Sequence, residues 1–181
     1  EQIFTGGENS FRDAWLDVME KSLTDFCTKI RQIVDDVDDT IRIGFCAGYT
    51  SWDIEGADPI ELSYILAGNN KPFLRLTSAP YWVSRNRRRF PGQQLNAVIE
   101  TARAQEAWCR ESGIEIFNEN DTYPRPRYHT PASYAECFDI ALRAGGNMGT
   151  LKYLFSYVSA PDYELGYLRI HKRNMPLYDW I

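Results

Sequence analysis

The chain has 181 residues and is 44% hydrophobic, so we expect one domain with a core of ordinary size. Its formal charge of −5 argues against a general nucleic-acid binder, because such domains carry an excess of positive charge. No apolar run is long enough for a membrane-spanning helix, and the first residues lack the basic region of a signal peptide, which leaves the compartment open.

Residues 1–5 have the composition of a strand end, and the glycines that follow would stop it. A long helix is expected from about Phe11 to Val37, because apolar residues recur there at steps of three and four. Asn9 or Ser10 is a good N-cap for it. The next expected elements are a strand at Ile41–Ala47, a short helix from Pro59 to about Ala67, and a strand at Pro72–Thr77.

The second half of the chain continues the alternation of helices and strands. We expect a helix at about Gln93–Ser112, a strand at Ile114–Phe117, a helix at Ala132–Ala144, a strand at Thr150–Phe155 and a last helix at Tyr167–Ile181. Strict alternation with short connections predicts an α/β fold with a parallel sheet and right-handed crossovers.

Two folds fit this order, an open doubly wound sheet and a (β/α)8 TIM barrel. A dinucleotide-binding sheet would carry a glycine-rich GxGxxG turn after a strand, and the sequence has none. Aromatic and acidic loops follow the expected strands instead, as at the active-site face of a barrel. A whole barrel takes roughly 250 residues, so we expect residues 1–181 to be a single partial domain, about half of one, that pairs with an upstream half.

The candidate catalytic residue is Glu119, which follows the short apolar strand expected at Ile114–Phe117. A strand fixed by the sheet that delivers a carboxylate to an open loop is how α/β enzymes hold a catalytic acid. The high aromatic share, 14%, suits the binding of flat ligands such as sugar rings. Arginines near the carboxylate would keep it ionised. The residues expected to contact substrate are Trp52, Asp53, Arg75, Tyr81, Trp82, Asp121, Arg125, Lys152 and Tyr157.

The strand order and two carboxylates resemble the second half of a retaining glycoside hydrolase of the TIM-barrel superfamily called clan A, which includes β-galactosidases. The resemblance implies that the four expected strands are strands five to eight, preceded by the end of strand four. It also implies that Glu119 is the nucleophile and Glu8 the acid/base, acting on an oligo- or polysaccharide without a cofactor or metal. One departure is that Asn9 follows Glu8, whereas the clan has Asn before Glu.

Several other interpretations stay open. Glu8 is also a favourable acid for a helix N-terminus, and Glu119 can be a loop carboxylate that pairs with Arg125. Lys152 can point into the barrel as the Schiff-base lysine of an aldolase or lyase, or it can be a buried partner of Glu119. A non-catalytic carbohydrate-binding barrel would keep the aromatic residues without both acids. The four cysteines lack metal-site spacing, and we expect all of them to be small buried side chains: Cys27, Cys46, Cys109 and Cys137.

Overall fold

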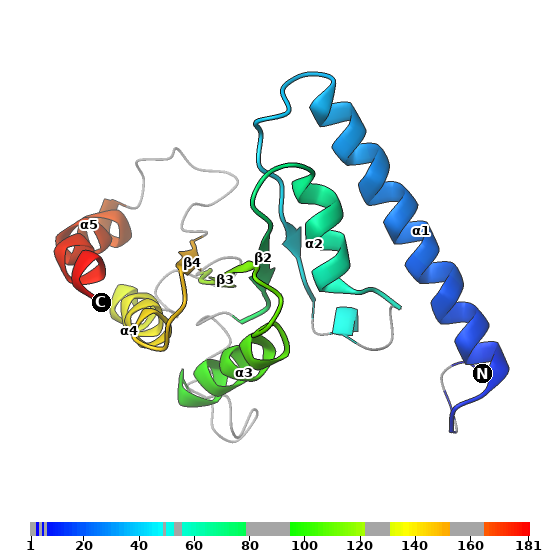
Figure 1. The fold of residues 1–181 in the computed structure, drawn as a ribbon. Coiled ribbons are helices and arrows are strands. Elements are labelled where there is room, and N and C mark those ends of the chain that lie inside the picture. Colours follow the sequence, from blue (N-terminus) through cyan, green and yellow to red (C-terminus); the bar gives the residue numbers. More distant parts are fainter. Residues whose placement is uncertain are drawn as a thin grey trace. The chain divides into compact units, whose positions relative to one another are not determined.

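The protein is an α/β protein in which helices and strands alternate, as predicted (Figure 1). The computed structural model describes residues 3, 5, 7–48, 50–52, 56–78, 95–121, 131–152 and 165–181. Over these ranges the elements are α1 (Ser10–Asp35), β1 (Phe45–Cys46), the 3-10 helix η1 (Thr50–Trp52), α2 (Pro59–Ala67), β2 (Phe73–Leu76), α3 (Leu95–Trp108), β3 (Glu115–Glu119), α4 (Ala132–Arg143), β4 (Gly149–Leu151) and α5 (Leu165–Trp180).

The strands form a four-stranded parallel sheet in the order β1-β2-β3-β4. In the register, Phe45 lies opposite Leu74 and Phe117 lies opposite Gly149. The chain divides into two compact units. Unit 1 comprises residues 1–75 and 111–115, and unit 2 comprises residues 76–110 and 116–181.

The start of the chain differs from the prediction. Ile3 lies in a turn and Thr5 in a bend, so the strand expected over residues 1–5 is not found at these two positions. The Arg12 Nε donates a hydrogen bond to the Ile3 carbonyl over 2.8 Å. Asn9 is the N-cap of α1, as predicted, because its Oδ1 accepts hydrogen bonds from the backbone N–H groups of residues 11 and 12.

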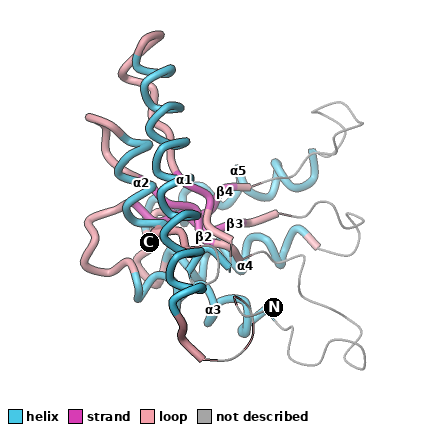
Figure 2. The backbone as a smooth tube through the Cα atoms, turned by 90° about the vertical axis from the view of Figure 1, so that its right-hand side faces the viewer, coloured by secondary structure: helices cyan, strands magenta, loops and turns pink. Residues whose placement is uncertain are grey.

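The core of unit 1 lies between α1 and α2, which run side by side (Figure 2). Cys27 of α1 packs there against Leu62 and Leu66 of α2, and Phe45 of β1 packs against the same cluster. The Arg31 side chain is buried beside this cluster, and its guanidinium donates to the carbonyls of residues 41 and 66. A buried guanidinium needs such acceptors, because an unpaired charge is costly to bury.

The two faces of β1 differ in their surroundings. Phe45 faces the helices, and successive side chains of a strand alternate between faces, so Cys46 and its register partner Arg75 point to the other face. Cys46 is accordingly exposed. The prediction of four buried cysteines is therefore wrong for Cys46 and also for Cys137 on α4, and it is confirmed for the two that remain.

The core of unit 2 lies between α3 and α4. Val98 and Ala102 of α3 pack there against Phe138 and Leu142 of α4, and all four side chains are buried. The residues recur at steps of four on each helix, which places them on one face of each. This packing fixes the two helices of unit 2 that lie against β3 and β4.

Glu115 is the centre of an ion cluster in unit 1. Its carboxylate contacts the Arg42 guanidinium at 2.5 Å and the Lys71 ammonium at 2.8 Å, and its side chain is 12% exposed. Hydrogen bonds from Lys71 and then Arg42 lower the pKa of Glu115 below its usual range. The folded state therefore favours the ionised carboxylate.

This pKa shift predicts that part of the stability depends on pH. Because the pKa of Glu115 is lower in the folded state, its contribution is present above the unfolded pKa of about 4.3 and is lost as the pH falls through the folded value. We expect Glu115→Gln to be less stable than the wild type at pH 7 and to lose less stability on acidification. Urea unfolding at a series of pH values measures both effects. Glu111→Gln, at an exposed position, is the control, and equal acid sensitivity of all three proteins would contradict the prediction.

Candidate functional site

Three polar residues at the carboxyl end of β3 are buried: Asn118, Glu119 and Asn120. Both the nitrogen and the oxygen of the Asn118 side-chain amide form hydrogen bonds. Its Nδ2 donates to the Glu106 carboxylate of α3 over 3.1 Å, and its Oδ1 accepts from the Ser78 hydroxyl over 2.7 Å. Asn118 therefore points toward the layer of helices.

Asn120 points the same way. Its Nδ2 donates to the Ala135 carbonyl of α4 over 2.8 Å and to the Thr150 hydroxyl of β4 over 3.1 Å. Its backbone N–H donates to the Leu151 carbonyl, which continues the parallel ladder one residue beyond β3. The chain is thus fixed immediately before and immediately after Glu119.

Glu119 points to the opposite face of the sheet from α3 and α4. This direction follows because side chains alternate along a strand and both neighbours of Glu119 reach the helices. Its register partner Leu151 shares that face and is 42% exposed, whereas Glu119 itself is 8% exposed. In a closed barrel, the face away from the helices is the interior, and its carboxyl end is the active-site end.

The other predicted site residues that the structure describes lie in both units. Asp121 follows β3 in unit 2 and is partly buried. In unit 1, Glu8 is exposed and directly precedes the N-cap of α1, and Trp52 is partly buried in η1. Arg75 is partly buried in β2, on the face away from α1 and α2. The predicted site residues that lie outside the described residues are Asp53, Tyr81, Trp82, Arg125 and Tyr157.

Lys152 faces the helices, not the face of Glu119. Its ammonium lies 2.5 Å from the Asp139 carboxylate and 3.4 Å from the Glu136 carboxylate, both on α4. Thr150, two residues earlier, also points to this side. The alternation that drew attention to Lys152 is real, but the sequence does not show which of the two faces carries the helices.

The sequence reasoning missed the buried polar cluster around Lys152. The Glu136 carboxylate accepts hydrogen bonds from the Asn174 amide and the Tyr178 hydroxyl of α5, and the His171 ring lies 3.4 Å from it. Burial, and then the Glu136 carboxylate, raise the pKa of Tyr178 above its usual range. The signal was present in the spacing, because residues 171, 174 and 178 recur at steps of three and four on one face of α5.

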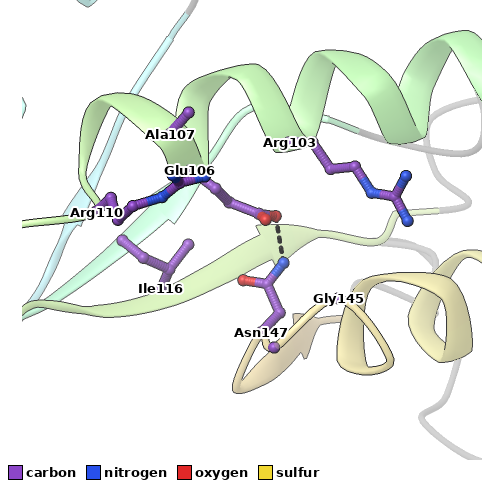
Figure 3. Close-up of a pocket in the computed structure, with 8 residues that line it drawn as sticks. Arg103, Glu106, Ala107, Arg110, Ile116, Gly145 and Asn147 are labelled. Carbon is purple, nitrogen blue, oxygen red and sulfur yellow. Dashed lines mark hydrogen bonds between the residues drawn. The ribbon is translucent and has the colours of Figure 1, made fainter.

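A pocket of about 490 Å³ opens beside α3, on the helix side of unit 2 (Figure 3). None of the predicted site residues that the structure describes lines this pocket. Its lining comes from α3 and the turn after it, the start of β3 and the turn after α4: Arg103, Glu106, Ala107, Arg110, Ile116, Gly145, Gly146 and Asn147. Figure 3 shows Glu106 and Asn147 pointing toward each other, and the Glu106 Oε1 accepts from the amides of Asn147 and Asn118. This network joins α3 to the sheet.

Comparison with protein-family models, with curated proteins and with solved structures gave no match. Within the described ranges, no group of three or more His, Cys, Asp or Glu side chains is arranged to hold a metal ion. None of the helices described is long and apolar enough to cross a membrane.

Proposed function

We propose that the protein is part of a (β/α)8-barrel glycoside hydrolase and that Glu119 is its catalytic nucleophile. The strand order supports the barrel. Consecutive strands lie side by side without a reversal, as they do around a (β/α)8 barrel, whereas a doubly wound sheet reverses its strand order at a switch point.

The observation that carries the catalytic proposal is the position of Glu119. The carboxylate stands at the carboxyl end of a parallel strand, faces away from the helices and is nearly buried. Burying a carboxylate costs stability, so a position that serves only packing rarely holds one. Asn118 and Asn120 anchor the strand on the other face, which is the rigid support that a catalytic group needs.

The proposed reaction is retaining hydrolysis of a glycosidic bond. The Glu119 carboxylate would attack the anomeric carbon and form a covalent glycosyl-enzyme, which water then hydrolyses. The acid/base that protonates the leaving group is proposed to be Glu8, as the resemblance to the clan implies. A retaining enzyme holds its two carboxyl groups about 5–5.5 Å apart. Aromatic side chains in the loops after the strands would stack against the sugar.

Covalent labelling tests this proposal directly. The protein is first assayed with a panel of aryl β-glycosides, and the 2-deoxy-2-fluoro analogue of the sugar that is hydrolysed is then used as the probe. We expect the glycosyl group to be trapped on the peptide that contains Glu119, located by mass spectrometry. Glu111→Gln, an exposed carboxylate changed in the same way as a control, should be labelled as fast as the wild type. Label on another residue would refute the role of Glu119, and sugar binding without turnover would favour a non-catalytic carbohydrate-binding barrel.

A further inference from the structure

The long helix of unit 1 carries a row of large apolar side chains that stay exposed. Phe11 is 65% exposed, Val18 65%, Phe26 61% and Ile33 64%. We call these four residues the exposed stripe of α1. They are separated by seven, eight and seven residues, and such spacings return to one side of a helix. At the rise per residue of an α-helix, the stripe is about 33 Å long. This length matches that of a full helix and exceeds the contact that a short peptide would make.

The exposed stripe continues the contact that α1 makes with α2. Leu23 and Ile30 pack against the buried cluster between the two helices. They lie three residues before and four residues after Phe26, so the packed and exposed positions adjoin on the helix surface. The apolar arc of α1 is thus wider than its contact with α2 needs. A helix with one neighbour normally has a polar surface beyond the contact, so this arc fits a second neighbour.

The outer edge of strand β1 in unit 1 also lacks a neighbour among the described residues. β1 is at the end of the strand order, so among the described residues β2 pairs with it on one side and no strand pairs with the other. An open strand edge presents unpaired N–H and C=O groups that favour the addition of another strand. Cys46 of β1 is also exposed. A lone helix would cover the stripe but not the strand edge, and a lone strand would do the reverse.

We propose that unit 1 binds a further αβ unit, in which a helix that lies along the exposed stripe of α1 is followed by a strand that pairs in parallel with β1. This inference rests on the proposed barrel, in which each strand has a parallel neighbour and each helix lies between two others. The partner is an amphipathic helix of about 20 residues, since that length spans the stripe, followed by a strand. Apolar side chains of this size rarely form an extended exposed row unless a partner covers them.

Site-specific photo-crosslinking tests the proposal. A benzophenone amino acid is placed at Ile33 in the gene at its natural locus, so that the whole reading frame and its partners are present. We expect cross-links to the helix of a helix–strand segment that lies outside residues 1–181. The matched control is the same substitution at Asp17, which is exposed and about 160° around the helix from Ile33. The Ile33 position should give a severalfold higher yield.

The possible outcomes separate this inference from the proposed function. Cross-links from Ile33 to another copy of residues 1–181, or equal yields at Ile33 and Asp17, would overturn the docking proposal. Because labelling of Glu119 reports only the chemistry, the two proposals can fail separately. A labelled Glu119 with no Ile33 cross-link would refute the docking alone, and the reverse result would refute the glycosidase alone. Circular dichroism of each variant verifies that an exposed substitution leaves the fold intact.

Discussion

Replacing Glu119 with alanine is expected to lower kcat for an aryl glycoside by roughly 10⁴-fold or more, the size of the loss when an enzyme nucleophile is removed. Added azide should restore turnover, because a small anion can enter the space left by the carboxylate and attack the anomeric carbon. The product would then be a glycosyl azide of inverted configuration, since a single displacement replaces the two displacements of a retaining enzyme. Product analysis by NMR identifies the anomer.

The control for this experiment is Glu111→Ala, which removes an exposed carboxylate only four residues before the start of β3. It should keep the wild-type rate and show no response to azide. The midpoint of urea unfolding must also show that the Glu119→Ala protein is folded under the assay conditions. A folded Glu119→Ala variant that retains activity would exclude Glu119 as the nucleophile. A folded variant that is inactive both with and without azide would show that Glu119 has a role other than attack on the anomeric carbon. That result would also contradict the proposal.

The helices were predicted well because their ends are marked locally. α2 shows this, since the Asp58 Oδ1 accepts hydrogen bonds from the N–H groups of residues 60 and 61, and Pro59 fits the first turn. The strands were predicted too long in unit 1. A strand was expected at Ile41–Ala47, whereas β1 comprises Phe45–Cys46. A strand extends only as far as its partner pairs with it, and that partner is distant in the sequence.

The sequence indicated where Glu119 lies along the chain of elements, but not the direction in which its side chain points. An apolar strand followed by polar residues located Glu119 beyond a strand ending at Phe117, whereas β3 extends to Glu119 itself, so the carboxylate is on the last strand residue and not in the loop. Alternation alone does not show which face of the strand meets the helices, so the anchoring of Asn118 and Asn120 was not foreseen. The prediction for Lys152 was wrong for the same reason. Lys152 was expected to point into the barrel, as a Schiff-base lysine or as a partner of Glu119, whereas its partners are on α4.

Lys152→Met is expected to destabilise the protein by about 3–5 kcal/mol, the usual cost of removing one partner from a buried ion pair. The Lys152 side chain is 10% exposed, and it contacts the Asp139 and Glu136 carboxylates, which are 0% and 7% exposed. Without it, Arg143 remains paired with Asp139 at 2.9 Å, but the Glu136 carboxylate loses its only lysine or arginine partner among the described residues. The midpoint of urea unfolding, at an unchanged m-value, measures the loss.

The matched control is Lys172→Met on α5, the same substitution at an exposed lysine, which should change stability by no more than about 0.5 kcal/mol. A double variant tests the electrostatic cause. If the loss comes from unpaired carboxylates, Lys152→Met combined with Asp139→Asn should be more stable than the sum of the two single changes, because the second change removes a charge that the first left unpaired. Strict additivity would instead assign the loss to packing of the lysine stem. A loss for Lys152→Met no larger than that of Lys172→Met would show that the cluster is hydrated, and it would remove the case for an ion network joining α4, β4 and α5.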